Sequence, residues 1–291
     1  AGIAGWLAAK ITRLPLIIDV RDDWELMILE VGGSELFVTM MYNLFNLIYQ
    51  SADIVFCTSM TLRNKLIKRG VKPSQVKWLP NAADTNLFKP LDEERVLQSR
   101  AQHKVKGPMI IWAGTFNIHQ AIDTLIKAAP KVREAFPNVQ ILLAGGGPLT
   151  PELKKLRNDL NVGCVKFLGV LSRTKVPELI AAADIAVVTM RDSASCGSRI
   201  PVRFYEYIAC GIPIVASIPL DSELARIITD NKIGMVAPAE DPNALASGVI
   251  RLLKDWKLAK EYGINGRTLA IRDYDRRALT IRLLEIARTL A

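Results

Sequence analysis

The sequence predicts an α/β protein built from two doubly wound domains with parallel sheets. From residue 108 onward, short apolar segments alternate strictly with amphipathic helical segments. The apolar segments, such as 109–113 and 184–189, show no regular polar alternation, which is typical of strands buried on both faces. Parallel strands need a helical crossover, so this alternation favours a parallel sheet with helices on both sides. A length of 291 residues leaves room for two such domains.

Composition and charge narrow the possible classes of function. The formal net charge is +9, but the basic residues are spread along the chain, without a Lys/Arg-rich block interleaved with aromatic residues. This argues against a dedicated nucleic-acid binder and is compatible with phosphate-bearing ligands or an anionic membrane surface. The four cysteines are widely spaced, so we predict no metal site and a reduced, cytoplasmic setting.

Polar residues follow the first strand expected at the front of the chain. We expect the following elements there: a helix over 1–10, strands over 14–24, 52–59 and 76–84, and a basic helix over 61–69. Ligands of open α/β sheets bind at the carboxyl ends of strands, so Asp19, Arg21 and Asp22 could face a cleft. An ordinary turn, with an aspartate capping the next helix, is the alternative.

The segment 35–50 predicts an unusual helix that is apolar nearly all round and contains no Lys or Arg. Such a helix is either buried or lies against something apolar. We favour packing within its own domain. Contact with a membrane is the alternative, which the lack of basic residues weakens.

The segment 199–217 is predicted to form a loop, a helix, a glycine break and a buried strand. Pro201 can begin a helix because its missing N–H would be unsatisfied there anyway, and Gly211 can end it in a left-handed turn. Arg203 and Glu206 then lie in the first turns, where they could hold a phosphate and a ribose. A solvated ion pair, worth about 0.2–0.5 kcal/mol, is the alternative on spacing alone.

Glycines end two of the predicted strands of the second domain. Gly114 ends one, and the run 145–147 ends the next. Glycine lets backbone N–H groups approach a phosphate, and a following helix N-terminus favours negative charge. The spacing does not make a dinucleotide fingerprint, so a nicotinamide enzyme is not expected.

The motif Pro-x-Arg-x-x-Glu-Tyr-x-Ala-x-Gly-x-Pro-x-Val-Ala, over 201–216, closely resembles the nucleotide-sugar loop of the family 4 retaining glycosyltransferases. The resemblance extends over nearly the whole chain. It implies the GT-B fold, in which two Rossmann-like domains face a cleft. It also implies that the N-terminal domain is truncated, since members of the family carry more residues before this point. The first sheet should then be incomplete.

The resemblance implies four parts of the chain: a partial acceptor-side domain over 1–90, a linker over 91–107, a nucleotide-sugar domain over 108–265, and a helix over 266–291 that crosses back. The implied catalytic pair is Arg203 and Glu206. The implied donor-binding residues are Gly114, Thr115, His119, Gly145, Gly147, Arg199, Pro201, Arg203, Glu206 and Glu223. The implied acceptor-side residues are Asp19, Arg21, Asp22, Ser59 and Asn81.

The sequence departs from the family pattern at three positions. Thr115 and Gln120 stand where many relatives have an arginine and a lysine on the diphosphate. Ser198 stands where relatives often have a glutamate. The pattern is most similar to the branch that modifies lipid-linked and cell-surface glycans.

The function that the resemblance implies is transfer of a sugar from a nucleoside diphosphate, UDP by preference, to a glycan or polyprenyl-linked acceptor. The nucleotide-sugar is a substrate, and neither a cofactor nor a metal is predicted. The expected location is cytoplasmic, at the inner face of a membrane with peripheral contact. Two alternatives remain: a nucleotide-sugar epimerase of the same fold, and a truncated or degenerate nucleotide-sugar-binding protein without activity.

Overall fold

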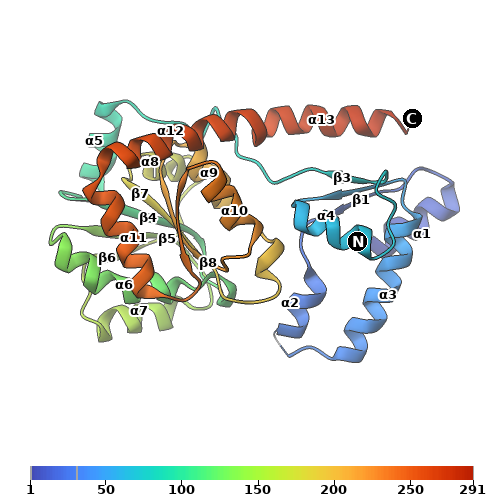
Figure 1. Cartoon of the computed structure of the whole chain (residues 1–291), viewed down its shortest axis with the longest axis horizontal. Helices are drawn as coiled ribbons and strands as arrows, with labels where there is room; N and C mark the ends of the chain where they lie inside the picture. Colours follow the sequence, from blue (N-terminus) through green and yellow to red (C-terminus); the bar gives the residue numbers. More distant parts are fainter. Residues whose placement is uncertain (1, 31, 291) are drawn as a thin grey trace. The chain divides into compact units, whose positions relative to one another are not determined.

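The computed structural model describes residues 2–30 and 32–290. The chain forms two compact units, here called unit 1 (residues 1–81, 193–200 and 277–291) and unit 2 (residues 82–192 and 201–276). Figure 1 shows the elements of each. Unit 2 is the larger, and it contains nearly all the residues predicted to bind the donor.

Unit 1 is built on a parallel sheet with the strand order β1-β2-β3. Its strands are β1 (Ile17–Val20), β2 (Ile54–Cys57) and β3 (Val76–Trp78). Its helices are α1 (Gly2–Thr12), α2 (Trp24–Glu30), α3 (Glu35–Ser51), α4 (Met60–Lys68) and most of α13 (Arg276–Arg288). One side of the sheet packs against Tyr49, Leu62 and Leu66, and apolar residues of α13 pack against Ile54 and Phe56. Ile17 in the edge strand β1 is 40% exposed.

Unit 2 contains a six-stranded parallel sheet in the order β6-β5-β4-β7-β8-β9. The strands are β4 (Met109–Thr115), β5 (Gln140–Gly146), β6 (Val165–Gly169), β7 (Ile185–Thr189), β8 (Ile214–Ile218) and β9 (Gly234–Pro238). The helices are α5 (Glu93–Gln102), α6 (Ile122–Ala135), α7 (Thr150–Asp159), α8 (Lys175–Ala181), α9 (Val202–Ala209), α10 (Glu223–Asp230), α11 (Pro242–Lys254) and α12 (Trp256–Asp273). They cover both faces of the sheet (Figure 1). This confirms the predicted doubly wound sheet, and the strand order reverses between β4 and β7.

The expected linker over 91–107 is wrong, because α5 occupies most of it and packs within unit 2. Asp92 caps the helix by accepting a hydrogen bond from the Arg95 backbone N–H at 2.9 Å. Arg95 pairs with Glu178 on α8 at 2.6 Å, and Arg100 pairs with Asp184. The charged composition of this segment reflects a helix with one solvated face.

Helix α3 does not bury its apolar surface as we favoured. Val38, Ile48 and Tyr49 are buried, but four large apolar residues are between 52% and 72% exposed: Leu36, Phe37, Met40 and Leu47. The helix therefore presents an open apolar face among the described residues of unit 1.

The helical segment expected at the end of the chain is broken into α12 and α13. Tyr274 and Asp275 separate them, and the Ala83 N–H donates to the Tyr274 carbonyl at 3.2 Å while the Arg276 N–H donates to the Ala83 carbonyl at 2.9 Å. Unit 2 consequently extends to Arg276, and the part of the chain that belongs to unit 1 begins at 277 rather than 266.

Candidate functional site

The carboxyl ends of β4 and β5 bring two of the predicted glycines together. Gly114 and Gly145 are register partners and have φ angles of +147° and +140°. A Cβ at Gly145 would lie 1.8 Å from the Gly114 carbonyl oxygen, and one at Gly147 would lie 2.4 Å from the Phe116 carbonyl oxygen. The close approach of neighbouring backbone segments therefore requires glycine at positions 145 and 147.

Arg203 lies at this strand end and is 7% exposed. Its guanidinium stacks 4.4 Å from the centre of the Trp112 ring and donates to the Thr189 carbonyl at 3.3 Å and to Gln120 Oε1. Among the described residues, its Nε has no hydrogen-bond partner. Burial lowers the pKa of Arg203 to about 10, so the side chain remains a cation at neutral pH. A buried cation at the end of a strand is suited to an anionic ligand.

Gly114 gives this cation access to the strand end. A Cβ at Gly114 would lie 3.1 Å from one terminal guanidinium nitrogen of Arg203. Because Gly114 has no side chain, the Arg203 guanidinium lies directly beside the backbone at this strand end. Thr115, the next residue, is exposed.

Sequence reasoning missed the residues that position Arg203. Gln120, noted only as a missing lysine, accepts from the guanidinium, and its carbonyl accepts from Thr189 Oγ1. Trp112 Nε1 donates to the same Thr189 oxygen at 3.1 Å. Tyr207, on α9, accepts from the Ala113 N–H at 2.7 Å. A tryptophan two residues before Gly114, in a strand otherwise filled by aliphatic residues, was the available signal.

Glu206 lies on α9 one turn after Arg203. Burial raises the pKa of Glu206, although Arg276, Arg203 and Arg173 oppose the shift. A half-buried carboxylate close to cations can accept hydrogen bonds from a pair of hydroxyl groups. The geometry therefore brings the predicted catalytic pair and Gly114 together in unit 2.

Replacing Glu206 by glutamine is expected to stabilise the protein at neutral pH. Because burial raises the folded-state pKa above its ordinary value of 4.5, the folded chain holds the proton more tightly than the unfolded chain. As the pH rises from 4.5 through the folded-state pKa of Glu206, ionisation of this carboxyl group therefore lowers the unfolding free energy. Urea denaturation across this range should show a gain for Glu206→Gln at pH 7 that shrinks towards pH 4.5. The exposed Glu152→Gln is the control, and a gain independent of pH would contradict the prediction.

The remaining donor-side residues of unit 2 lie on neighbouring elements. His119 belongs to a single 3₁₀ turn over 118–120 and accepts from the Arg191 N–H through its carbonyl at 3.2 Å. Glu223 begins α10 and is 8% exposed. Pro201 precedes α9 as its N-cap residue, one position earlier than a first helical residue. Gly211 ends that helix with the expected positive φ, +72°.

Arg199 differs from the expected grouping, because the structure places it in unit 1. Its Nε lies 3.5 Å from Asp22 Oδ1, and its guanidinium also contacts Met27 Sδ at 2.6 Å. Ser195 on the same segment donates to the Glu30 carboxylate through its N–H at 2.9 Å and its hydroxyl at 2.7 Å. The segment that precedes α9 in the sequence is therefore held by residues of unit 1.

Three of the predicted acceptor-side residues form a cluster, while Asp22 pairs with Arg199 and Ser59 lies apart. Arg21 bonds Asp19 at 3.1 Å and also contacts Asn81, and burial raises the pKa of Asp19. Ser59 is fully buried and caps α4 by accepting from the Leu62 N–H at 3.1 Å. Its hydroxyl serves the helix, so direct contact with an acceptor is not expected there.

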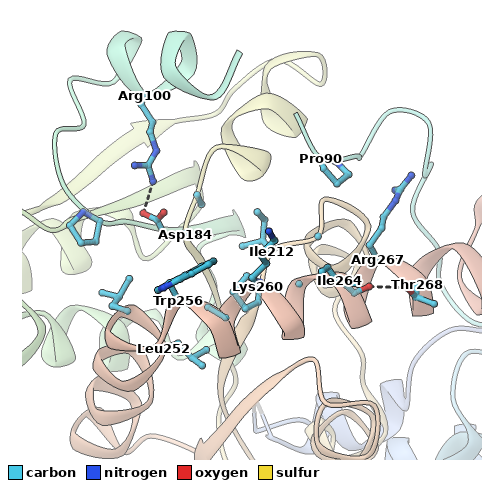
Figure 2. A pocket seen from close by; sticks show the side chains of 17 residues that line it. Pro90, Arg100, Asp184, Ile212, Leu252, Trp256, Lys260, Ile264, Arg267 and Thr268 are labelled. Carbon is cyan, nitrogen blue, oxygen red and sulfur yellow. Dashed lines mark hydrogen bonds and ion pairs between the residues drawn. The ribbon is translucent and has the colours of Figure 1, made fainter. Parts of the chain in front are cut away.

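A cavity of about 660 Å³ in unit 2 lies away from these residues (Figure 2). It is bordered by Pro108, Asp184 and Pro213, which precede strands β4, β7 and β8. It is therefore at the amino ends of the strands, whereas Gly114 and Arg203 are at the carboxyl ends. None of its lining residues belongs to the predicted donor site.

The described residues show neither a metal-binding group nor a membrane-spanning helix. Residues 2–30 and 32–290 contain no group of three or more His, Cys, Asp or Glu placed to hold a metal ion. Over the same residues, none of the helices is both long enough and apolar enough to cross a bilayer. The prediction that no metal is needed stays a prediction.

The strand order and crossovers of unit 2 define a doubly wound, Rossmann-like α/β domain. The chain belongs to the family described as "Glycosyl transferases group 1", whose model matches residues 94–269. The match spans nearly all of unit 2, including Arg203 and Glu206.

Solved structures confirm the fold class. The structure resembles HepE of Anabaena in complex with UDP, with a TM-score of 0.83, 20% identity, and coverage of 99% of this chain and 76% of that chain. It also resembles sucrose-phosphate synthase from Thermosynechococcus elongatus, with a TM-score of 0.78, 23% identity, and coverage of 99% and 72%. At this level of identity the likeness shows the fold alone.

Mannosyltransferases are among the curated relatives. One, from Mycolicibacterium smegmatis, is a "GDP-mannose-dependent alpha-(1-6)-phosphatidylinositol monomannoside mannosyltransferase", 27% identical over 241 residues. Another, from Corynebacterium glutamicum, is a "GDP-mannose-dependent monoacylated alpha-(1-6)-phosphatidylinositol monomannoside mannosyltransferase", 29% identical over 224 residues. The matches cover 81% and 74% of this chain. The chain spans only 62% and 56% of these relatives.

Proposed function

We propose that the chain belongs to a retaining glycosyltransferase that moves a sugar from a nucleoside-diphosphate donor to a glycan or lipid-linked acceptor. The observation that supports this most directly is the buried Arg203 guanidinium, one terminal nitrogen of which lies beside Gly114 at the strand end. Membership of the family supports the reaction class.

In the proposed reaction, Arg203 binds the donor diphosphate. The bond between the sugar C1 and the diphosphate oxygen breaks, a bond from C1 to the acceptor hydroxyl oxygen forms on the same face, and the hydroxyl proton passes to the leaving diphosphate. A fixed cation aimed at the departing oxygen stabilises the charge that develops there. This leaves no step that requires a protein nucleophile or a metal.

Glu206 is proposed to accept hydrogen bonds from the donor ribose, and Glu223 to contact hydroxyl groups of the sugar. Both carboxylates belong to unit 2: Glu206 lies within α9, one turn after Arg203, and Glu223 is the first residue of α10. Ribose is common to UDP and GDP donors, so Glu206 does not select the base. The sequence favours UDP, while the relatives named above depend on GDP-mannose.

A lipid-linked acceptor is supported by two observations. The named relatives act on phosphatidylinositol mannosides, and the exposed residues of α3 offer apolar surface in unit 1. We place the reaction at the cytoplasmic face of a membrane on this basis.

Calorimetric titration with UDP, GDP, a UDP-sugar and GDP-mannose tests the donor proposal. We expect one base to bind more tightly and Glu206→Ala to weaken binding about tenfold, as for a lost charge-assisted hydrogen bond. Uridine and guanosine, which carry ribose without phosphate, separate the contribution of Glu206 from that of Arg203. Failure of all four nucleotides to bind would overturn the proposal. Turnover of a nucleotide-sugar to its epimer without acceptor would favour the epimerase.

A further inference from the structure

The junction between α11 and α12 carries an exposed tryptophan between two hollows. Trp256 begins α12 and is 72% exposed. One hollow is the cavity of Figure 2, where Trp256 lies near Leu252 and Ile264. The other has a volume of about 780 Å³ and lies among α6, α11 and α12. Neither contains a residue of the candidate donor site.

The second hollow is strongly basic. Its lining includes four cations from three helices: Lys131, Arg251, Lys254 and Lys257. A fifth, Lys260, places its ammonium 6.0 Å from the Trp256 ring centre. One carboxylate, Asp255, lines the hollow, and it accepts the Leu258 N–H at 3.0 Å as the cap of α12.

We call these five cations the junction cations. In the part of the chain that the structure describes, none of them forms an ion pair, and Lys131 bonds only to Ser247 Oγ at 3.3 Å. Like charges gathered in one place repel each other and raise the local concentration of anions. The surplus of positive charge fits an anionic partner.

The apolar surroundings decide which anionic partner fits. The indole ring partitions into the headgroup region of bilayers, and Leu252, Leu253 and Ile264 add apolar surface on the side of the cavity. Single-stranded nucleic acid would need several aromatic rings on which successive bases stack. Within the described lining of the two hollows, Trp256 is the one aromatic residue. A lipid surface is therefore favoured over RNA.

We propose that the α11–α12 junction docks unit 2 onto an anionic lipid bilayer. Trp256 enters the interface, and the junction cations contact headgroup phosphates. The proposal goes beyond the proposed function, because the junction borders the cavity at the amino ends of the strands and not the site of Arg203 at their carboxyl ends. It assigns the membrane contact to unit 2, separately from the apolar face of α3.

Flotation with vesicles of phosphatidylcholine alone, or of phosphatidylcholine mixed with phosphatidylglycerol, tests the docking surface without donor or acceptor. We expect binding to the anionic vesicles only, weakening as salt is raised. Each cation near an anionic surface contributes a factor of about five in binding. Lys254→Gln with Lys257→Gln should therefore reduce the partition about 25-fold, and Trp256→Ser should reduce it further.

The matched control is Lys89→Gln with Lys106→Gln, which removes the same net charge from exposed positions of unit 2. It should retain most of the binding. Circular dichroism checks that each variant is folded. Equal loss in both double variants, or loss on Leu36→Ser with Met40→Ser in α3 but not at the junction, would overturn the proposal. Binding of an RNA oligonucleotide through the same lysines, without vesicle binding, would also overturn it.

Nucleotide titration separates this proposal from the proposed function. The junction variants should bind the donor nucleotide as the unchanged chain does, because the cations lie outside the site of Arg203. Vesicle binding without any nucleotide binding would support the docking surface and overturn the donor proposal alone.

Discussion

Replacing Arg203 by alanine is expected to abolish detectable donor binding and to lower kcat/KM about 100-fold or more. The side chain supplies a buried cation beside Gly114, and nearby residues already hold it in place. Loss of its hydrogen bonds to Gln120 and Thr189 should also lower the unfolding free energy by about 2–3 kcal/mol. Calorimetric titration with the preferred nucleotide, below the unfolding transition, measures the effect on binding.

Arg203→Lys separates charge from geometry. Lysine retains the cation but cannot donate in a planar fork or stack over Trp112 in the same way. We expect intermediate donor binding and a smaller loss of stability. If Arg203→Ala binds the nucleotide as well as the unchanged chain does, the arginine is a packing element and the proposed diphosphate site is wrong.

Replacing Gly145 by alanine is expected to destabilise unit 2 by about 3 kcal/mol or more, because two costs add. The added Cβ would lie 1.8 Å from the Gly114 carbonyl oxygen, and the φ angle of +140° is strained for any residue with a side chain. Relief would require separating β4 from β5, where their backbones are paired. Urea denaturation followed by circular dichroism measures the loss.

The neighbouring glycine provides the control. A Cβ at Gly146 would meet only the Val170 side chain, at 3.4 Å, so Gly146→Ala should change the unfolding free energy by less than about 1 kcal/mol. A Gly145→Ala variant as stable as Gly146→Ala would show that the strand ends are less tightly packed than the structure indicates.

Hydrophobic patterning predicted the sheet of unit 2 well. Buried parallel strands leave a strong signal, a run of apolar residues between helical segments. Strand β8 lies where the segment 199–217 was predicted to end in a buried strand. Helix α5 was missed because its apolar content is low. Its position depends on Arg95 and Arg100, whose partners lie more than 80 residues away along the chain.

The candidate site could be predicted only in part. Arg203 and Glu206 were predicted because their spacing lies inside a motif that resembles a known family. Gln120 was read as a lost cation, whereas its amide oxygen accepts from Arg203. That contact depends on the approach of a loop after β4 to a helix that follows β7, and no local pattern encodes it. Ser59 is the opposite case: it was predicted to face the acceptor because it is a polar residue at a strand end, but its hydroxyl caps α4.

The segment 193–200 limits how unit 2 can be transferred from one protein to another. Unit 2 is compact in space but not continuous in sequence, because this segment interrupts it and belongs to unit 1. Its Ser195 and Arg199 are held by Glu30 and Asp22. A recombination event that transplanted residues 82–276 into another gene would carry along eight residues fitted to a first unit left behind. A protein that acquired a new donor preference by taking up unit 2 would therefore also need changes in residues 193–200, so that they fit its own first unit.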